Sequence, residues 1–276
     1  IELGDGNQTI LAGDGANRIT TGNGDSSVTT GSGSDEISLG SGNHTINAGD
    51  GNNIIEVSEG EQSVVTGDGK DRIALKNGSH TIITGDGDKI IEAGDGESRI
   101  STGDGDNRIT LGDGDHLIKT GVGNDTIETG DGDQIIQAGG GDNLIKTGSG
   151  DQIIITEGGA DTVITGSGDD RIATGDGDDI VDSGDGNDFI FTGAGGDSID
   201  GGEGDDTITY QNSNEGVNVN LDTGMGSGGD AEGDTIRNIE NIGGSSFSDA
   251  ITGDDDDNIV DGGAGNDVLS GGLGSD

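Results

Sequence analysis

The sequence lacks several residue types altogether: it has no cysteine, no proline and no tryptophan, with one tyrosine and three phenylalanines in 276 residues. Without cysteine the chain forms no disulfides, which leaves its redox compartment open but suits an exported protein. No stretch approaches the ~18 apolar residues of a transmembrane helix, and no N-terminal signal peptide is visible. We therefore expect neither disulfides nor membrane insertion.

Positive charge is also scarce, because 11 Lys and Arg stand against 56 Asp and Glu, a formal net charge of −45. Such a surface repels nucleic acid and anionic lipid, so neither is an expected partner. A chain this acidic and this poor in aromatic residues is normally disordered, since it buries too little apolar surface to offset chain entropy. Here the apolar residues are strictly periodic and the acids keep fixed offsets from glycines, which predicts a chain that a cation folds.

A nine-residue repeat runs from Leu3 to Thr209 as 23 consecutive units without an insertion. Position 4 of the unit is Gly in all 23, and position 8 is Ile in 19 and Val in four. Position 2 is Gly except at Ser58, Lys76 and Glu157. This regularity predicts a repeat architecture rather than a low-complexity segment.

Each unit predicts a turn followed by a short strand. Glycines two residues apart allow positive φ, so positions 1–6 form the turn. Positions 7–9 and the next position 1, such as residues 18–21, form the strand; positions 8 and 1 face inward and positions 7 and 9 outward. Two units then close a flattened coil of 18 residues, and stacked coils form two parallel sheets. The expected fold is an all-β solenoid.

The unit resembles the RTX (haemolysin-type) calcium-binding nonapeptide, G-G-x-G-x-D-x-U-x. The best matches are GGEGDDTIT at 201–209 and GGAGNDVLS at 262–270, and the likeness covers nearly the whole chain. The resemblance implies a right-handed parallel β-roll, Ca²⁺ held between successive turns by position-6 aspartates and turn carbonyls, and export by a type I secretion system. Carboxylate and carbonyl oxygens are the ligands that Ca²⁺ requires.

Position 6 differs between the two edges of the predicted roll, because alternate units stack on opposite edges. One edge, here the even edge, alternates Asn with Asp from Asn17 to Asp161, apart from Lys89, and continues with Asp179 and Asp197. The other, the odd edge, begins with Gln8 and has no acid at this position before Asp170. We expect calcium on the even edge throughout and on both edges from about residue 170, with weaker sites where Asn replaces Asp. The predicted ligands, including those of a later repeat block, are Asn17, Asp35, Asn53, Asp71, Asn107, Asp125, Asn143, Asp161, Asp170, Asp179, Asp188, Asp197, Asp206, Asp249, Asp267 and Asp276.

Basic side chains at position 6 predict interruptions in these columns. Lys89 should place an ammonium where the cation would lie. His44, His80 and His116 recur 36 residues apart on the odd edge. That spacing is two coils, roughly 10 Å at the usual strand separation, which is too far to share one ion, and zinc needs about four ligands. A hydrogen-bonded Gln/Ser/His column is therefore favoured over a zinc site.

The outer face of the odd sheet is uncharged over its first five coils, from Thr9 to Ile83, and later carries Ile135, Ile153, Ile155, Phe189 and Phe191. Such a strip is either a contact surface for another copy, a polysaccharide or ice, or chance variation on a solvated face. Ice binding would need a regular file of Thr or Asn, and this strip is too mixed.

The repeat stops at Tyr210, which divides the chain into three predicted domains. Residues 1–209 form the main roll, and 244–276 form a second, truncated repeat block. Between them, 210–243 has alternating apolar positions and predicts an irregular β insertion with a loop at 224–234. Both ends fall in mid-unit, so we expect a fragment of a larger protein.

No catalytic constellation is present, because cysteine is absent, the histidines lie along one edge and the glycine-rich runs do not join a strand to a helix. We therefore do not expect an enzyme. The main expectation is a calcium-stabilised structural or extender module of a secreted bacterial cell-surface protein (adhesin, surface layer, fibril or matrix) that folds on Ca²⁺ after export. The alternatives are a ligand-binding or self-associating module and an accessory calcium domain of a secreted enzyme.

Overall fold

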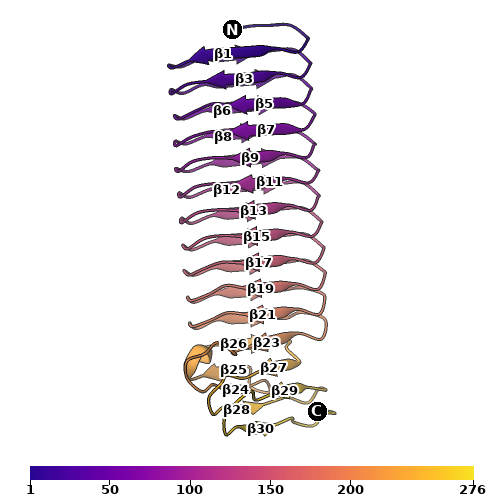
Figure 1. The fold of residues 1–276 in the computed structure, drawn as a ribbon. Helices are drawn as coiled ribbons and strands as arrows, with labels where there is room; N and C mark the ends of the chain where they lie inside the picture. Colours follow the sequence, from indigo (N-terminus) through magenta and orange to yellow (C-terminus); the bar gives the residue numbers. More distant parts are fainter. The chain divides into compact units, whose positions relative to one another are not determined.

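The computed structural model describes all of residues 1–276 and consists of short strands, with one 3₁₀ turn, η1 (Gly229–Ala231), and no α-helix. The chain divides into two compact units, residues 1–139 and 140–276. Each is a two-sheet parallel β-solenoid, so the predicted all-β fold class is confirmed (Figure 1). No helix is long and apolar enough to cross a membrane. The predicted domain boundaries at 209 and 243 follow the repeat pattern and stay predictions.

In the first unit every coil gives one strand to each sheet. The odd edge leads into one sheet, in the order β1-β3-β5-β7-β9-β11-β13-β15, and the even edge leads into the other, β2-β4-β6-β8-β10-β12-β14. Neighbouring strands are parallel and pair residues 18 apart, as in Ile46↔Val64 and Ile55↔Ile73. The coil length therefore agrees with the predicted pair of nine-residue units.

The strands of the first unit are short, and their bounds are as follows: β1 Thr9–Gly13, β2 Arg18–Thr20, β3 Ser27–Thr30, β4 Glu36–Leu39, β5 His44–Asn47, β6 Ile54–Val57, β7 Gln62–Val65, β8 Arg72–Ala74, β9 Thr81–Ile83, β10 Ile90–Ala93, β11 Arg99–Ser101, β12 Arg108–Leu111, β13 Leu117–Lys119, β14 Thr126–Glu128 and β15 Ile135–Gln137.

The second unit continues the same alternation and then changes. One sheet has the order β17-β19-β21-β23-β27-β29, and the other has β16-β18-β20-β22-β26-β25-β24-β28-β30. Within the latter, β24 and β25 pair antiparallel, as do β25 and β26. The bounds are β16 Leu144–Lys146, β17 Ile153–Ile155, β18 Thr162–Ile164, β19 Arg171–Ala173, β20 Ile180–Asp182, β21 Phe189–Phe191, β22 Ser198–Asp200, β23 Thr207–Thr209, β24 Asn218–Asn220, β25 Met225–Ser227, β26 Thr235–Arg237, β27 Asn241–Gly243, β28 Ala250–Thr252, β29 Ile259–Asp261 and β30 Val268–Ser270.

The core is a pair of aliphatic columns made by position 8. Ile19, Ile37 and Val64 are 0% exposed, and the other position-8 side chains up to Ile208 are buried as well. Burying one such side chain contributes roughly 1.5–3 kcal/mol. Threonine at position 1 closes the core at the turn, and the Thr30 hydroxyl donates to the Ala48 carbonyl at 2.9 Å. One coil alone has nothing to cover its column, so stability comes from stacking.

Glycine at position 4 is required by both conformation and space. Gly105 has φ of 129°, a region that side chains rarely adopt. A Cβ added there would also lie 2.7 Å from the carbonyl carbon of Gly87 in the turn beneath. Successive turns can therefore stack at strand spacing only with glycine at this position.

The segment after Tyr210 leaves the coil and rejoins it in register. β26 pairs with β22 as Ile199↔Ile236, and β27 pairs with β23 as Ile208↔Ile242. Asn238, with φ of 50°, makes the tight turn between them. The segment that leaves and returns contains β24, β25 and η1, and the predicted loop at 224–234 itself holds β25 and η1.

Candidate metal centres

One hydrogen bond recurs along both edges and orients most position-6 side chains, although Lys89 cannot accept it. The backbone N–H at position 6 donates to the position-6 side chain of the next coil: Asn17 to Asp35 Oδ1 at 2.8 Å on the even edge, and Asp170 to Asp188 Oδ1 at 2.8 Å on the odd edge. The other oxygen or nitrogen of that side chain then points into the space before the following turn. We call this space an inter-turn slot.

Lys89 shows what an inter-turn slot is suited to hold. Its Nζ lies 3.2 Å from Asp71 Oδ2 and donates to the carbonyl oxygens of Gly67, Gly69 and Asp86. The side chains of both Lys89 and Asp71 are 0% exposed. Four oxygens therefore surround one buried positive charge. The Lys89 ammonium occupies the place where the sequence predicts a metal cation in the other slots.

The asparagines fill the same slots with their amide nitrogens. Asn17 Nδ2 donates to the carbonyls of Gly13 and Gly15 at 3.0 and 2.8 Å, and to Asp35 Oδ1 at 3.0 Å. The same type of bond to turn carbonyls is made by Asn53, Asn107 and Asn143.

The prediction that Asn17, Asn53, Asn107 and Asn143 are calcium ligands stays a prediction. In this structure their amide nitrogens, not their oxygens, face the turn carbonyls. The reason is that the amide oxygen is needed elsewhere: Asn53 Oδ1 accepts the Asp35 N–H at 3.0 Å, which turns the NH₂ group toward the turn carbonyls. As placed, these residues compete with a cation for its ligands.

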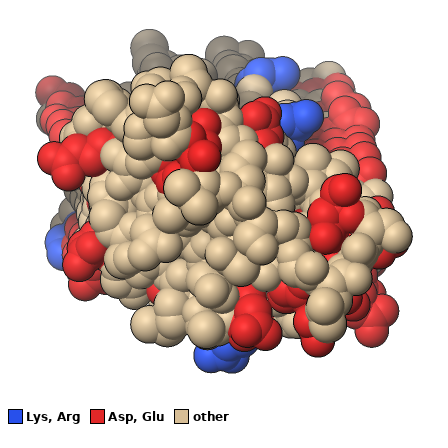
Figure 2. Space-filling model, turned by 90° about the horizontal axis from the view of Figure 1, so that it is seen from below, with Lys and Arg blue, Asp and Glu red and all other residues tan.

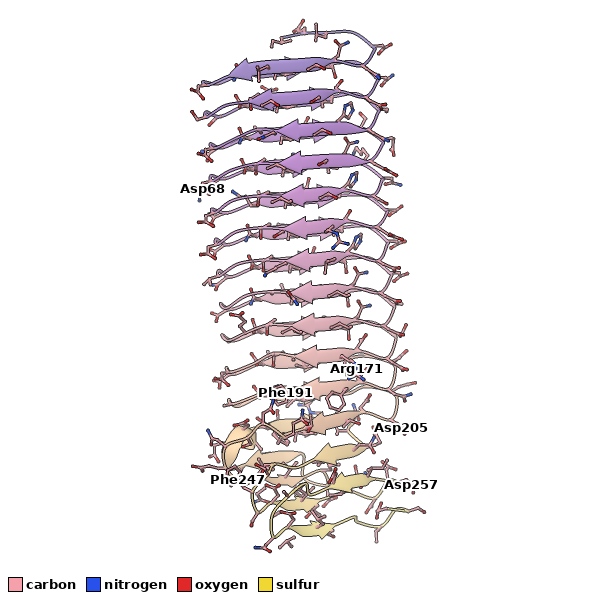
Figure 3. The ribbon with its side chains drawn as sticks, viewed as in Figure 1. Asp68, Arg171, Phe191, Asp205, Phe247 and Asp257 are labelled. Atoms are coloured by element: carbon pink, nitrogen blue, oxygen red, sulfur yellow. The ribbon has the colours of Figure 1, made fainter.

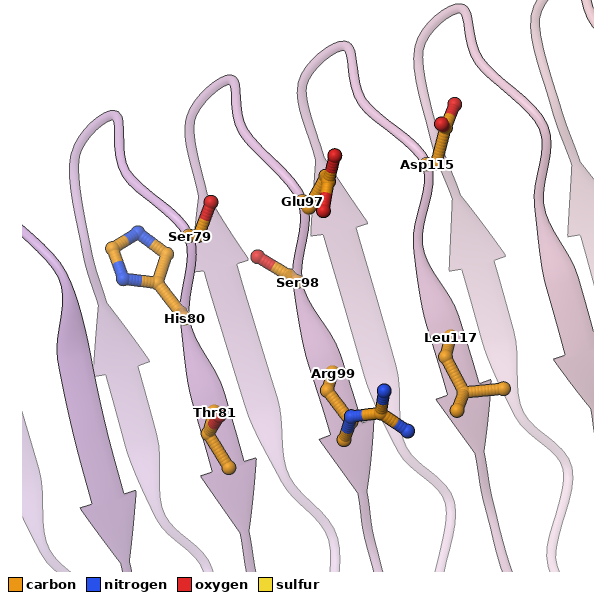
Figure 4. A pocket seen from close by; sticks show the side chains of 8 residues that line it. All are labelled: Ser79, His80, Thr81, Glu97, Ser98, Arg99, Asp115 and Leu117. Carbon is orange, nitrogen blue, oxygen red and sulfur yellow. The ribbon is translucent and has the colours of Figure 1, made fainter.

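The odd edge of the first unit is closed by uncharged side chains. His44 Nδ1 accepts the Ser26 N–H at 3.1 Å, so its Nε2 carries the proton and donates to the Gly40 carbonyl at 3.0 Å. His80 and His116 make the same pair of contacts, and burial lowers the pKa of both rings. Figure 4 shows His80 and Ser98 at the turn ends of successive strands.

A hydrogen-bonded column of this kind is what the sequence favoured over zinc. The glutamines join it, since Gln62 Nε2 donates to the Gly42 carbonyl at 2.9 Å. No group of three or more His, Cys, Asp or Glu side chains in the chain is placed to hold a metal. A metal in this fold therefore has to use carbonyl oxygens beside its carboxylates.

Slots lined only by aspartate begin at Asp161. The six position-6 aspartates from there to the end of the main repeat are at most 1% exposed, and each has an Oδ2 without a hydrogen-bond partner: Asp161, Asp170, Asp179, Asp188, Asp197 and Asp206. Leaving a buried polar atom unpaired is costly, more so for a charge. These atoms are the strongest structural sign of ions.

The electrostatics of these aspartates also favour a cation. Burial raises the pKa of Asp170 and Asp179 to about 6, and neighbouring aspartates add to the effect. Burial likewise raises the pKa of Asp197 and Asp206 to about 7. None of these six aspartates forms an ion pair, so no Lys or Arg neutralises this cluster.

The remaining predicted ligands differ in what they offer. Asp35 also has a buried, unpartnered Oδ2, whereas Asp71 Oδ2 is taken by Lys89 and by the Thr66 hydroxyl at 2.7 Å. Asp249 is engaged through both oxygens by the N–H groups of Val217 and Ser245, at 2.8 and 2.7 Å. Asp125, Asp267 and Asp276 each accept one backbone N–H, from Asn107, Asp249 and Asn258 respectively.

Most other acids lie outside the slots, at positions 3 and 5. Their side chains accept backbone N–H groups of the next turn, as Asp68 Oδ1 does from Asp86 at 2.9 Å, and they stay exposed. In the end view of Figure 2 acidic atoms lie around much of the periphery, and stacks of them are seen at the left and right edges. Asp205 in Figure 3 is one of these outward-facing acids.

Two acids that the repeat pattern missed take the position-6 place in the segment that rejoins the coil. Asp234 Oδ1 accepts the Asp197 N–H at 2.9 Å, and Glu240 Oε2 accepts the Asp206 N–H at 2.8 Å. Separations of 37 and 34 residues replace the usual 18, so the period carried no signal for them.

Comparison with known families identifies the repeat. A profile of the RTX calcium-binding nonapeptide repeat (4 copies) matches residues 3–37, 29–61, 119–154, 128–163, 146–181, 155–190, 182–212 and 243–276, more than half of the chain. The chain belongs to this RTX family. RTX nonapeptides bind calcium, so the cation for which the aspartate slots are built is Ca²⁺. The profile leaves out residues 62–118, the stretch with Lys89 and two of the histidines. No curated protein matches the chain.

Proposed function

We propose that this RTX chain is a calcium-stabilised structural module of a secreted bacterial cell-surface protein, such as an adhesin, surface layer, fibril or matrix protein, and not an enzyme. The observation that carries the proposal is the set of six buried, unpartnered Oδ2 atoms between Asp161 and Asp206. Calcium supplies positive charge and coordination there, and the carboxylates with the turn carbonyls hold it.

The need for calcium is unequal along the chain. Many slots in residues 1–139 are filled by the Lys89 ammonium, by asparagine and glutamine amides or by neutral imidazoles, although Asp35 keeps an unpartnered Oδ2. Between Asp161 and Asp206 the position-6 side chains include no such donor, and these slots rely on ions. At the low calcium level inside a cell, carboxylate repulsion favours the open chain, which suits export. Outside, each bound ion stabilises the fold by RT ln(1 + [L]/Kd).

Hydrogen exchange on the full chain tests this proposal. In millimolar Ca²⁺ we expect the amides of both units to be protected. After chelation, amides within 161–209 should exchange far faster, while those of the filled slots in 17–119 keep most of their protection. Equal protection with and without calcium in 161–209 would contradict the proposal, and Mg²⁺ at the same ionic strength is the control for simple screening.

A second candidate role is association between copies through the odd-sheet face of the second unit. Its strands β17, β19 and β21 form an apolar groove with Ile153, Ile155 and Phe189, which are 40, 43 and 37% exposed. The Arg171 guanidinium lies 5.6 Å from the Phe189 ring centre (Arg171 and Phe191 are labelled in Figure 3). No acid lines this groove in a chain of net charge −45, which favours an apolar contact.

Sedimentation of the calcium-loaded chain separates this role from the first. The Phe189→Lys variant should be monomeric at concentrations where the wild type associates, with its circular dichroism unchanged. A wild type that stays monomeric at high concentration would rule the contact out.

A further inference from the structure

The segment that follows the main repeat brings an acid beside the last nine-residue coil. β27 pairs with β23 as Thr207↔Asn241, which places Glu240 next to Asp206. Glu240 Oε2 accepts the Asp206 N–H at 2.8 Å. Asp206 Oδ1 accepts the same type of hydrogen bond from the Asp188 N–H, also at 2.8 Å. Glu240 thus does the work of a position-6 side chain although it belongs to no nine-residue unit.

Asp206 supplies the other side of this slot. It is 0% exposed and its Oδ2 has no hydrogen-bond partner. Where an asparagine stands in the same place, as Asn143 does, its amide nitrogen reaches the Oδ1 of the next coil, here Asp161, at 2.9 Å. Between Asp206 and Glu240 both facing atoms are oxygens, and neither residue forms an ion pair.

The backbone carbonyl of Asn238 also lies near the Asp206 carboxylate, beside Gly201. Asn238 is the one non-glycine residue with positive φ, and its carbonyl oxygen lies against Gly201. A Cβ on Gly201 would collide with that oxygen and lie 2.6 Å from Asp206 Oδ2. The left-handed turn at Asn238 therefore brings a carbonyl and a carboxylate together where a side chain has no room.

The even edge ends differently and provides an internal contrast. Asp234 accepts the Asp197 N–H through Oδ1, but its Oδ2 accepts the hydroxyl of Tyr210 at 2.7 Å. The hydrogen bond from the buried Tyr210 hydroxyl therefore stabilises the Asp234 carboxylate. Glu240, the counterpart of Asp234 on the odd edge, receives no such hydroxyl, and the Oδ2 atoms of Asp197 and Asp206 both lack a hydrogen-bond partner.

We infer that Asp206, Glu240 and neighbouring turn carbonyls hold a divalent cation, and that this ion clamps the returning segment to the end of the main repeat. The inference rests on the proposed calcium-binding role but extends it beyond the nonapeptides, because Glu240 lies outside them. Two carboxylates with carbonyl oxygens form a hard-ligand set, which suits Ca²⁺ rather than a transition metal.

Native mass spectrometry of the full chain in Ca²⁺ counts the ions one by one. Glu240→Gln keeps an acceptor for the Asp206 N–H and removes one charge, and it should bind one ion fewer than the wild type. Glu203→Gln removes the same charge from an exposed side chain in the adjacent turn and should keep the wild-type count. Faster hydrogen exchange in 234–243 is expected only for Glu240→Gln.

Two results separate failure of this inference from failure of the proposed function. An unchanged ion count in Glu240→Gln overturns the inference, while a wild type that binds no calcium overturns the function. Should Glu240→Gln not fold, Asp206→Asn gives the second test, because its amide can donate to Glu240 as Asn143 donates to Asp161. That variant should fold and lose at least one ion, and a full count would again overturn the inference.

Discussion

At the scale of single residues, hydrogen-bond donors of the chain itself occupy several inter-turn slots. Lys89 is the extreme case, because its ammonium is buried among one carboxylate and three carbonyl oxygens. Burying an ion pair costs desolvation, but removing one partner is worse, since the other charge remains without compensation. A slot without its cation is therefore a weak point, whether the cation is a metal or a side chain.

Replacing Lys89 by Met tests this at one slot. Asp71 would keep its buried carboxylate and lose the ammonium, so we expect a loss of about 3–5 kcal/mol in calcium-free buffer. Added Ca²⁺ should recover part of the loss by entering the emptied slot. Chemical denaturation with and without Ca²⁺ measures both effects. Lys70→Met, which removes an exposed ion pair with Asp88, is the matched control and should change little.

At the scale of the edge columns, the order of Asn and Asp decides which slots need an ion. A slot between Asn and a following Asp has its own hydrogen-bond donor, as between Asn143 and Asp161, where the amide donates to Oδ1 at 2.9 Å. Asp followed by Asp leaves two oxygens facing each other, as between Asp179 and Asp197. Each such pair adds one uncompensated charge that calcium relieves.

Exchanging Asp and Asn at one position of a column should change how many calcium ions the chain binds and how much its stability depends on them. In Asp179→Asn the new amide can donate to Asp197 Oδ1, so we expect greater stability in chelator and one bound ion fewer. The reverse change, Asn143→Asp, should lower calcium-free stability and add one ion. Thermal unfolding with and without calcium, together with ion counting, checks both. The same direction of change in the two variants would contradict the slot description.

At the scale of the whole molecule, the two kinds of column respond to protons in opposite ways. For the aspartates, burial raises the folded pKa of Asp179 to about 6 and of Asp206 to about 7, from an ordinary 3.8. Their contribution to stability without calcium is complete below about pH 3.8 and is lost as the pH rises through 6 to 7. For His80 and His116, burial lowers the folded pKa below 6.5, so their contribution is present above 6.5 and lost at lower pH.

We therefore expect region-specific pH effects in calcium-free buffer. Acidification from pH 7.5 to pH 5 should increase protection within residues 161–209 and decrease it within 80–119, after correction for intrinsic exchange rates. Calcium should remove the first effect and leave the second. Hydrogen exchange resolved by peptide measures both regions in one sample, and a uniform response along the chain would refute the expectation.

Much of the architecture could be predicted from the sequence because it is carried by a strict period. Invariant glycine at position 4 and branched aliphatic residues at position 8 determine turns, strands and core in every unit. The same period separated the two edges and placed Lys89 and the histidines among the position-6 residues. Local spacing is sufficient for these features, since each residue meets its counterpart 18 positions away.

Tertiary structure alone decided what each position-6 side chain does in its slot. Asn and Asp have almost the same shape, and only the bond from the preceding N–H shows that asparagine turns its amide nitrogen, not its oxygen, toward the carbonyls. The tertiary structure also placed Asp234 and Glu240 in the columns. Asp234 lies 37 residues after Asp197, and Glu240 lies 34 residues after Asp206, so the nine-residue period does not predict either contact. The sequence by itself thus determined the repeating slots, because each is built by one period. Hydrogen-bond direction and the return of the chain decided which donors and acceptors line each slot.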